Sequence, residues 1–162
     1  MKRTNMPNTA VLHAADDAPA PWADRIGRWL MAFDAVATLG ALARGIQIMT
    51  DVSDERLLTE AWRTFAYVLF AGLWALVAVA PRGQRGLWEL LLLHKTAVTV
   101  FALAVGHVPE SSQTALVDGF LVVSTAAAYV LCRGWQAWRP AAPAPVGGAP
   151  VPARTDASAT HA

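Results

Sequence analysis

The sequence has a single cysteine, Cys132, among its 162 residues, and it contains no familiar catalytic or nucleotide-binding motif. One cysteine excludes an internal disulfide, a CxxC redox pair and a cysteine-rich metal or iron–sulfur site. A nucleophile elbow, an HExxH zinc motif, a Walker A sequence and a dinucleotide fingerprint are all absent. The sequence therefore gives no motif for a hydrolase or a kinase, and no cofactor or metal is expected.

Charge is also scarce, at 15% of residues, and it is nearly balanced at a formal net charge of +1. This balance gives no support to nucleic-acid binding. Apolar residues dominate instead, at 55%, and they gather in four runs at about 29–49, 61–80, 87–108 and 115–132. Each run can cross the roughly 30 Å hydrocarbon core of a bilayer as a helix of about 20 residues. Because backbone groups in lipid must bond within their own segment, we predict an all-α integral membrane protein.

The connections between the runs are short, so consecutive helices should be antiparallel neighbours. We predict a four-helix up-down-up-down transmembrane bundle over residues 25–138, with little chain left for a soluble domain. Residues 1–24 lack the apolar core of a cleaved signal peptide, and residues 139–162 are rich in Pro and Ala. Both segments are predicted to be disordered tails.

Basic residues near the runs predict the orientation in a membrane. They precede the first run, occupy the second connection and follow the fourth run: Arg25, Arg28, Arg82, Arg85, Arg133 and Arg139. The first connection is mainly acidic, and the third has neither Lys nor Arg. The positive-inside rule then places both termini in the cytoplasm of a multi-pass protein of the plasma (inner) membrane. Six tryptophans near the predicted interfaces indicate an aromatic belt: Trp22, Trp29, Trp62, Trp88, Trp135 and Trp138.

Six ionisable residues within or beside the apolar runs form the candidate site: Asp34, Arg44, Arg63, Glu89, Lys95 and Asp118. A charge at the middle of a membrane helix costs at least roughly 2.5–3.5 kcal/mol, so these charges need a physical reason. Depth in the membrane can be counted at about 1.5 Å per residue. The count puts two of these residues, Asp34 and Lys95, in the cytoplasmic half of the membrane. The outer half contains Arg44, Arg63 and Asp118. The predicted ion pairs are Asp34 with Lys95, and Asp118 with Arg44 or Arg63.

Helical spacing predicts which faces point inward. One face of the first run combines charge with small residues: Asp34, Ala37, Thr38, Ala41, Arg44 and Gly45. The second run carries Tyr67, Phe70 and Trp74 beside Arg63. His94 falls on the opposite side of the third run from Lys95, and no histidine on another run could serve as a second ligand. Haem or metal binding is therefore not expected.

Three interpretations of the charges remain open. Structural ion pairs that fix helix register would suit an accessory or assembly subunit with a membrane partner or further copies of itself. A polar ligand site or proton relay along Asp34, Lys95 and Asp118 would suit a small transporter. An acid–base set would suit a membrane oxidoreductase or lipid-modifying enzyme. The absence of motifs favours the accessory subunit over an enzyme. Glu89 and Arg63 lie close to the ends of their runs, so their charged groups could also reach the membrane interface without any partner.

In its four short runs with cytoplasmic ends the chain resembles several small bacterial membrane families, including the DoxX-like group. Asp34, within residues 32–39, is similar to the acidic residue in the first span of small multidrug-resistance transporters. Those transporters are shorter, have a weaker charge bias and lack a buried lysine like Lys95. Since the likeness is one of architecture and not of motif, it transfers no activity, cofactor or site residue to this chain.

Overall fold

The computed structural model describes residues 18–139, which contain helices and no strand. Four α-helices are followed by a short 3₁₀-helix: α2 (Pro21–Asp51), α3 (Asp54–Val79), α4 (Leu87–Ala104), α5 (Ser111–Leu131) and η1 (Gly134–Trp138). All four α-helices are long and apolar enough to cross a membrane. The prediction of an all-α fold with four membrane-competent helices is confirmed.

Three helices, α2, α3 and α5, begin earlier than the apolar runs indicated. Helix α2 starts at Pro21, because a proline ring suits the first turn, where its missing N–H needs no partner. Residues 21–24 of the predicted disordered tail are therefore helical, which corrects that boundary. Helix α5 starts at Ser111, directly after Glu110 turns the chain with a φ of 69°. The predicted tail residues 1–17 and 140–162 lie outside the described residues.

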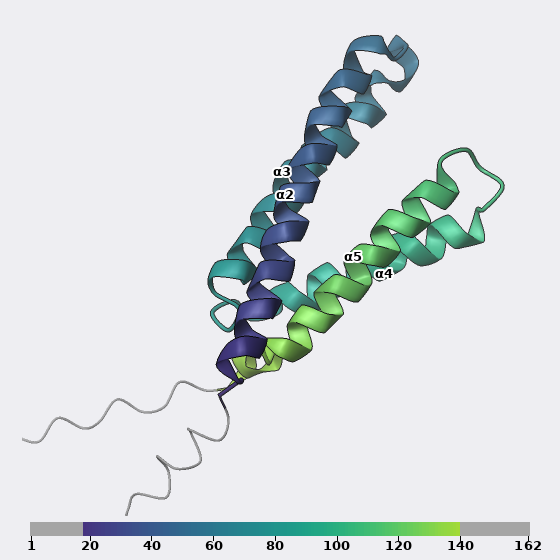
Figure 1. Cartoon of the computed structure of the whole chain (residues 1–162). Helices are drawn as coiled ribbons and strands as arrows, with labels where there is room; N and C mark the ends of the chain where they lie inside the picture. Colours follow the sequence, from purple (N-terminus) through teal and green to yellow (C-terminus); the bar gives the residue numbers. More distant parts are fainter. Residues whose placement is uncertain (1–17, 140–162) are drawn as a thin grey trace, which may run out of the picture.

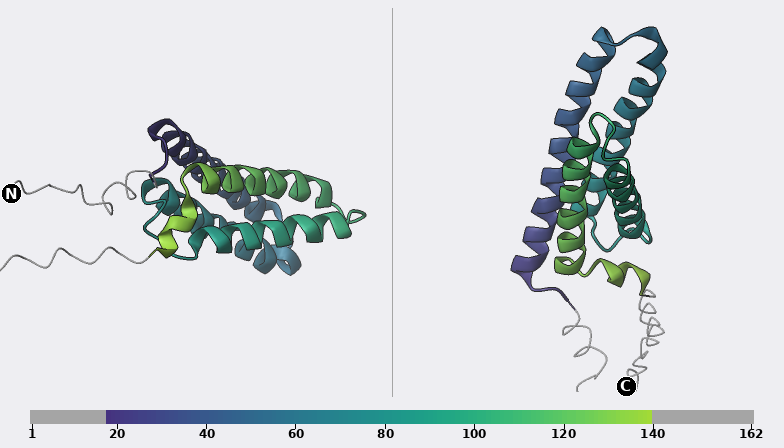
Figure 2. Two further views of the ribbon diagram at one scale, coloured as in Figure 1. Left: turned by 90° about the horizontal axis from the view of Figure 1, so that it is seen from below. Right: turned by 90° about the vertical axis from the view of Figure 1, so that its right-hand side faces the viewer.

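The helices form two antiparallel hairpins, α2 with α3 and α4 with α5 (Figure 1). In the first hairpin Gly45 allows close packing, since a Cβ at this position would lie 2.5 Å from the Thr64 hydroxyl. The hairpins meet at one end and diverge at the other (Figure 1), and the loops of both hairpins point away from the end where the two termini lie (Figure 2). We call the end where the hairpins meet the closed end and the other the open end. The divergence was not predicted, and it leaves α3 and α4 with little contact although they are consecutive.

The hydrophobic core lies at the closed end, where Met31, Trp74 and Trp88 are fully buried. Trp88 donates its Nε1 hydrogen to the carbonyl oxygen of Pro81 at 2.7 Å. Its predicted place in the aromatic belt is therefore wrong, because the indole fills the core and satisfies a buried backbone acceptor. The other five tryptophans of the predicted belt are exposed, as contact with lipid headgroups would require: Trp22, Trp29, Trp62, Trp135 and Trp138.

Arginine side chains hold the closed end together. Arg82, in the connection between α3 and α4, donates to Asp24 of α2 at 2.5 Å and to the carbonyl oxygen of Cys132 at 2.9 Å. Arg28 donates to the same Asp24 at 2.7 Å and to the carbonyl oxygen of Val79 at 2.7 Å. Charge-assisted bonds of this kind are among the stronger hydrogen bonds in proteins. They join α2, α3 and the end of α5 at the point from which the hairpins diverge.

Candidate ligand cleft between the hairpins

A cleft of about 630 Å³ lies between the two hairpins, and all four α-helices contribute to its walls. This volume falls within the range of about 300–1,000 Å³ that is typical of small-molecule sites. The inward face predicted for the first run lines it, with the exception of Asp34. The polar and aromatic lining residues that matter below are Thr38, Arg44, Arg63, Tyr67, Phe70, His94, Lys95, Glu110 and Asp118.

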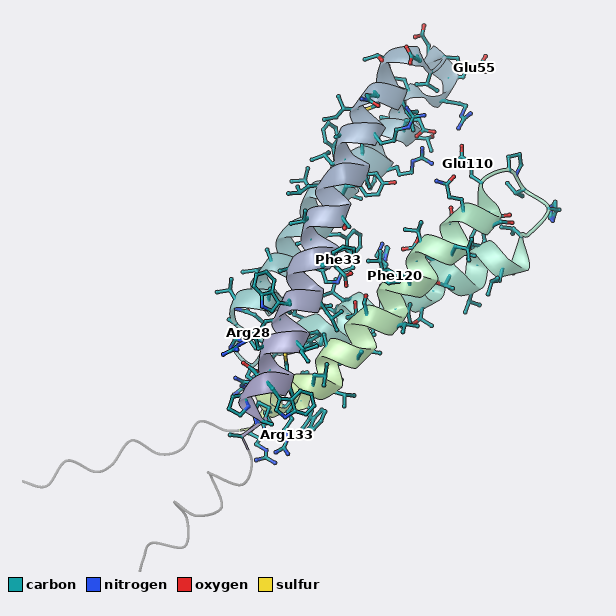
Figure 3. All side chains as sticks on the ribbon, viewed as in Figure 1. Arg28, Phe33, Glu55, Glu110, Phe120 and Arg133 are labelled. Carbon is teal, nitrogen blue, oxygen red and sulfur yellow. The ribbon has the colours of Figure 1, made fainter. Side chains whose placement is uncertain are left out.

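The two hairpins touch where they begin to diverge. Phe33 of α2 and Phe120 of α5 meet edge to face there, with ring centroids 6.2 Å apart (Figure 3). Towards the open end the two arms separate, and Glu55 and Glu110 lie near the tips of different arms (Figure 3). The two hairpins are therefore in side-chain contact on the closed side and lie further apart in the opposite direction.

An ion pair between Lys95 of α4 and Asp118 of α5 lies in the cleft wall, with Nζ 2.7 Å from Oδ1. The ammonium group also lies 4.4 Å from the ring centroid of Phe70 and 5.4 Å from that of Trp74. Both charged side chains are largely buried. The pair and the aromatic faces together compensate for the loss of water around the two charges.

Asp34 occupies a separate, fully buried position where α2 packs against α5. Its Oδ2 accepts a hydrogen bond from the Ser124 hydroxyl at 2.7 Å, and its Oδ1 has no partner. The predicted pair with Lys95 is wrong. Lys95 instead pairs with Asp118 on the other helix of its own hairpin, because the antiparallel packing of α4 and α5 places the two residues at a similar distance from the open end.

The remaining predicted pair, Asp118 with Arg44 or Arg63, is also wrong. Arg63 of α3 instead lies 2.5 Å from Glu60 and 2.9 Å from Glu110. The second contact crosses the cleft, because Glu110 immediately precedes α5 on the other hairpin. Glu60, which is almost fully buried, also accepts from Arg56 at 2.9 Å. Arg63 therefore bridges both hairpins near the open end.

Arg44 and Glu89 have different surroundings from the other predicted site residues. Arg44 is exposed in the cleft wall, and its Nη1 lies 3.4 Å from Gln47 Oε1, with no acidic partner among the described residues. Glu89 lies away from the cleft, at the closed end, where it accepts from Tyr129 and Trp138 at 3.0 Å each. The structure thus brings Arg44, Arg63, Lys95 and Asp118 to one cleft and leaves Asp34 and Glu89 outside it.

His94 and Glu110 are among the lining residues that sequence reasoning missed. His94, expected on the far side of its helix, packs against Phe70 with ring centroids 4.6 Å apart. Its neighbour Lys95 lines the same cleft, because the cleft meets more than a single stripe of α4. Glu110 lies outside every apolar run, so a search restricted to the runs could not find it. The sequence did contain a signal for Glu110, because an acidic side chain directly after Pro109 indicates a polar loop residue at the start of the next helix. That loop places Glu110 in the cleft wall.

The arrangement offers charged and aromatic groups for non-covalent binding. Within residues 18–139, no three His, Cys, Asp or Glu side chains come together as a metal ion would need. No family model, curated protein or solved structure matches the chain. Residues 18–139 thus form an all-helical fold with four helices that are long and apolar enough to cross a membrane.

Proposed function

We propose that this protein is a small multi-pass membrane protein that binds a small molecule in the cleft, as a transporter or ligand-binding protein does. One observation supports this function above the others: an open cleft of about 630 Å³ has charged side chains from all four helices in its walls. Ion pairs that served only to fix helix register would need no such space between the hairpins. The cleft thus favours ligand binding over the purely structural interpretation.

We further propose that the cleft faces away from the cytoplasm of a plasma (inner) membrane. Arg28 and Arg133 lie at the closed end, whereas Glu55 and Glu110 lie at the open end (Figure 3). The positive-inside rule places the basic end, and with it both termini, in the cytoplasm. A ligand would then enter from the outer side.

Cysteine labelling tests this orientation, because Cys132 is the one cysteine and is buried. Ser112→Cys introduces an exposed thiol at the open end, and Gln84→Cys introduces one in the α3–α4 connection. A membrane-impermeant maleimide should label Ser112→Cys in intact cells, and should label Gln84→Cys only after the membrane is opened. The reverse pattern would overturn the orientation, and the unaltered chain provides the unlabelled control.

Native mass spectrometry of the protein, purified gently from its own host, tests ligand binding. We expect a co-purifying small molecule that is lost from Ala41→Phe, because Ala41 lines the cleft. Ala43→Phe is the matched control, since Ala43 lies on the exposed side of the same helix and not in the cleft wall. A molecule retained equally by both variants would show that binding occurs elsewhere.

A second candidate function, an accessory or assembly subunit, is favoured by the slight contact between α3 and α4. A helix of a partner could enter the space that the diverging hairpins leave between these two helices. The same mass spectrum separates the candidates, because a stoichiometric second polypeptide in place of a small molecule would favour the subunit.

A further inference from the structure

The charges in the cleft are not fully paired. Three lining residues are cationic, Arg44, Arg63 and Lys95, and two are acidic, Glu110 and Asp118. Lys95 is held by Asp118 at 2.7 Å, and Arg63 is held by Glu110 and by Glu60 behind it. Both of these cations are therefore already neutralised by acids of the protein itself.

Arg44 is the exception. Its guanidinium has no acidic partner within residues 18–139 and makes only one long contact, 3.4 Å to the neutral Gln47. A guanidinium is charged at every physiological pH and has five N–H donors in a rigid fork that fits a carboxylate or a phosphate. Arg44 lies seven residues before Asp51, the last residue of α2. It is therefore about 10 Å along the helix axis from the end of α2.

Apolar and aromatic side chains from three helices also line the cleft. Phe70 of α3, Val98 of α4 and Leu121 of α5 all contribute to its walls. Phe70 also covers the ammonium group of Lys95, so the buried ion pair is shielded and presents an aromatic face towards the cleft. A bound molecule would thus meet the unpaired cation of Arg44 at one place and the apolar surface of Phe70, Val98 and Leu121 at another.

We infer that the ligand of the cleft is a small amphipathic organic anion, whose carboxylate or phosphate group binds Arg44 while its apolar body lies against Phe70, Val98 and Leu121. This assignment rests on the proposed function and names its substrate class. The anionic group pairs with Arg44, the one cation in the cleft wall that has no acidic partner within residues 18–139. Expulsion of water from the apolar walls contributes the remainder of the affinity.

The test uses three probes that share one apolar body and differ in the head group: phenylbutanoate, phenylbutanol and phenylbutylamine. Binding of radiolabelled phenylbutanoate to the full chain is measured by scintillation proximity in phosphatidylcholine nanodiscs, with empty nanodiscs as background. The unlabelled alcohol and amine then compete for the site. We expect the acid to bind and to be displaced at least about tenfold more effectively by itself than by either analogue, as loss of a charge-assisted bond predicts.

Variants locate the anion site. Arg44→Gln should weaken phenylbutanoate binding about tenfold or more, and Arg44→Lys should retain part of it, because a lysine keeps the charge without the fork. Arg25→Gln is the control, since Arg25 is an exposed arginine outside the cleft wall. Arg44 itself is exposed, so its replacement should leave the fold intact, which the unfolding temperature of each variant verifies.

The outcomes separate this inference from the function on which it rests. Unchanged binding in Arg44→Gln, or equal displacement by the amine, would overturn the assignment of an anion. Tight binding of the alcohol that is lost in Ala41→Phe would keep the cleft as a ligand site but remove the anion. If no probe binds and no small molecule co-purifies, the proposed function fails as well.

The natural anion could be a soluble molecule or the head group of a membrane lipid. Phosphatidylglycerol is therefore added to the nanodiscs in a parallel measurement. Displacement of phenylbutanoate by this lipid, again dependent on Arg44, supports an anion site and identifies a lipid as its source. Undiminished binding supports the same site and identifies a soluble amphiphile.

Discussion

Replacement of Lys95 by methionine should destabilise the protein strongly. The Lys95 and Asp118 side chains are 10% and 13% exposed and 2.7 Å apart, so the change leaves a carboxylate without its partner in an environment with little water. Methionine preserves the length of the side chain, which keeps the packing loss small. Removing one partner of a buried pair typically costs about 3–5 kcal/mol, and we expect a value in this range.

The loss of the ammonium group also removes its contacts with the rings of Phe70 and Trp74. Each such contact contributes about 0.5–2 kcal/mol, which places the expected cost towards the upper part of the range. The free energy of unfolding can be measured in mixed micelles with sodium dodecyl sulfate as denaturant. Tryptophan fluorescence of the chain is a suitable signal, because unfolding changes the surroundings of the two fully buried indoles, Trp74 and Trp88.

A double-mutant cycle isolates the ion pair from other effects of the substitution. Lys95→Met and Asp118→Asn are measured singly and together, and the double variant should lose less than the sum, because it leaves no unpaired charge. Arg25→Gln is the control, since Arg25 is exposed and has no ion pair within residues 18–139, so its replacement should change the free energy of unfolding by less than about 1 kcal/mol. A cost below about 1 kcal/mol for Lys95→Met, or additive single effects, would refute the structural role of the pair.

Three further substitutions test other parts of the structure by the same unfolding measurement. Gly45→Val should cost about 1–3 kcal/mol, because even a Cβ would lie 2.5 Å from the Thr64 hydroxyl; an unchanged stability would mean that α2 and α3 are not this close. Trp88→Phe should cost about 1–3 kcal/mol by leaving the buried carbonyl of Pro81 without its donor, and a neutral effect would place Trp88 outside the core. Asp34→Asn should leave stability unchanged or raise it by up to about 1 kcal/mol, because it keeps a hydrogen-bonding group of the same shape while removing a buried acid that has no cationic partner; a loss above about 3 kcal/mol would indicate that the carboxylate is paired after all.

The proposed ligand site also bears on the contact between the arms. Arg63 and Glu110 are 37% and 54% exposed, so their ion pair across the cleft is accessible to water. Exposed pairs of this kind contribute little free energy, about 0–1 kcal/mol. The link between the hairpins at the open end is therefore weak compared with the arginine network of the closed end, and entry of a ligand need not disrupt a large interaction.

The sequence by itself determined the class of the protein and its helices. Four apolar runs of membrane-spanning length can satisfy their backbone in lipid only as helices, and this constraint is local to each run. The inward face of the first helix was also predictable, because residues three and four apart share a helix face in any tertiary arrangement. For the same reason Arg44 and Gly45 were correctly expected to lie together on the face that lines the cleft.

Only the tertiary structure decided the ion pairs and the cleft. Pairing depends on which helices lie side by side and on where each helix ends, and residue counting did not place Lys95 and Asp118 at a similar level of the α4–α5 hairpin. The cleft depends on the angle between the two hairpins, which is set by packing around Met31, Trp74 and Trp88 at the closed end. Contacts between distant residues fix that angle, whereas hydrophobic periodicity describes one helix at a time.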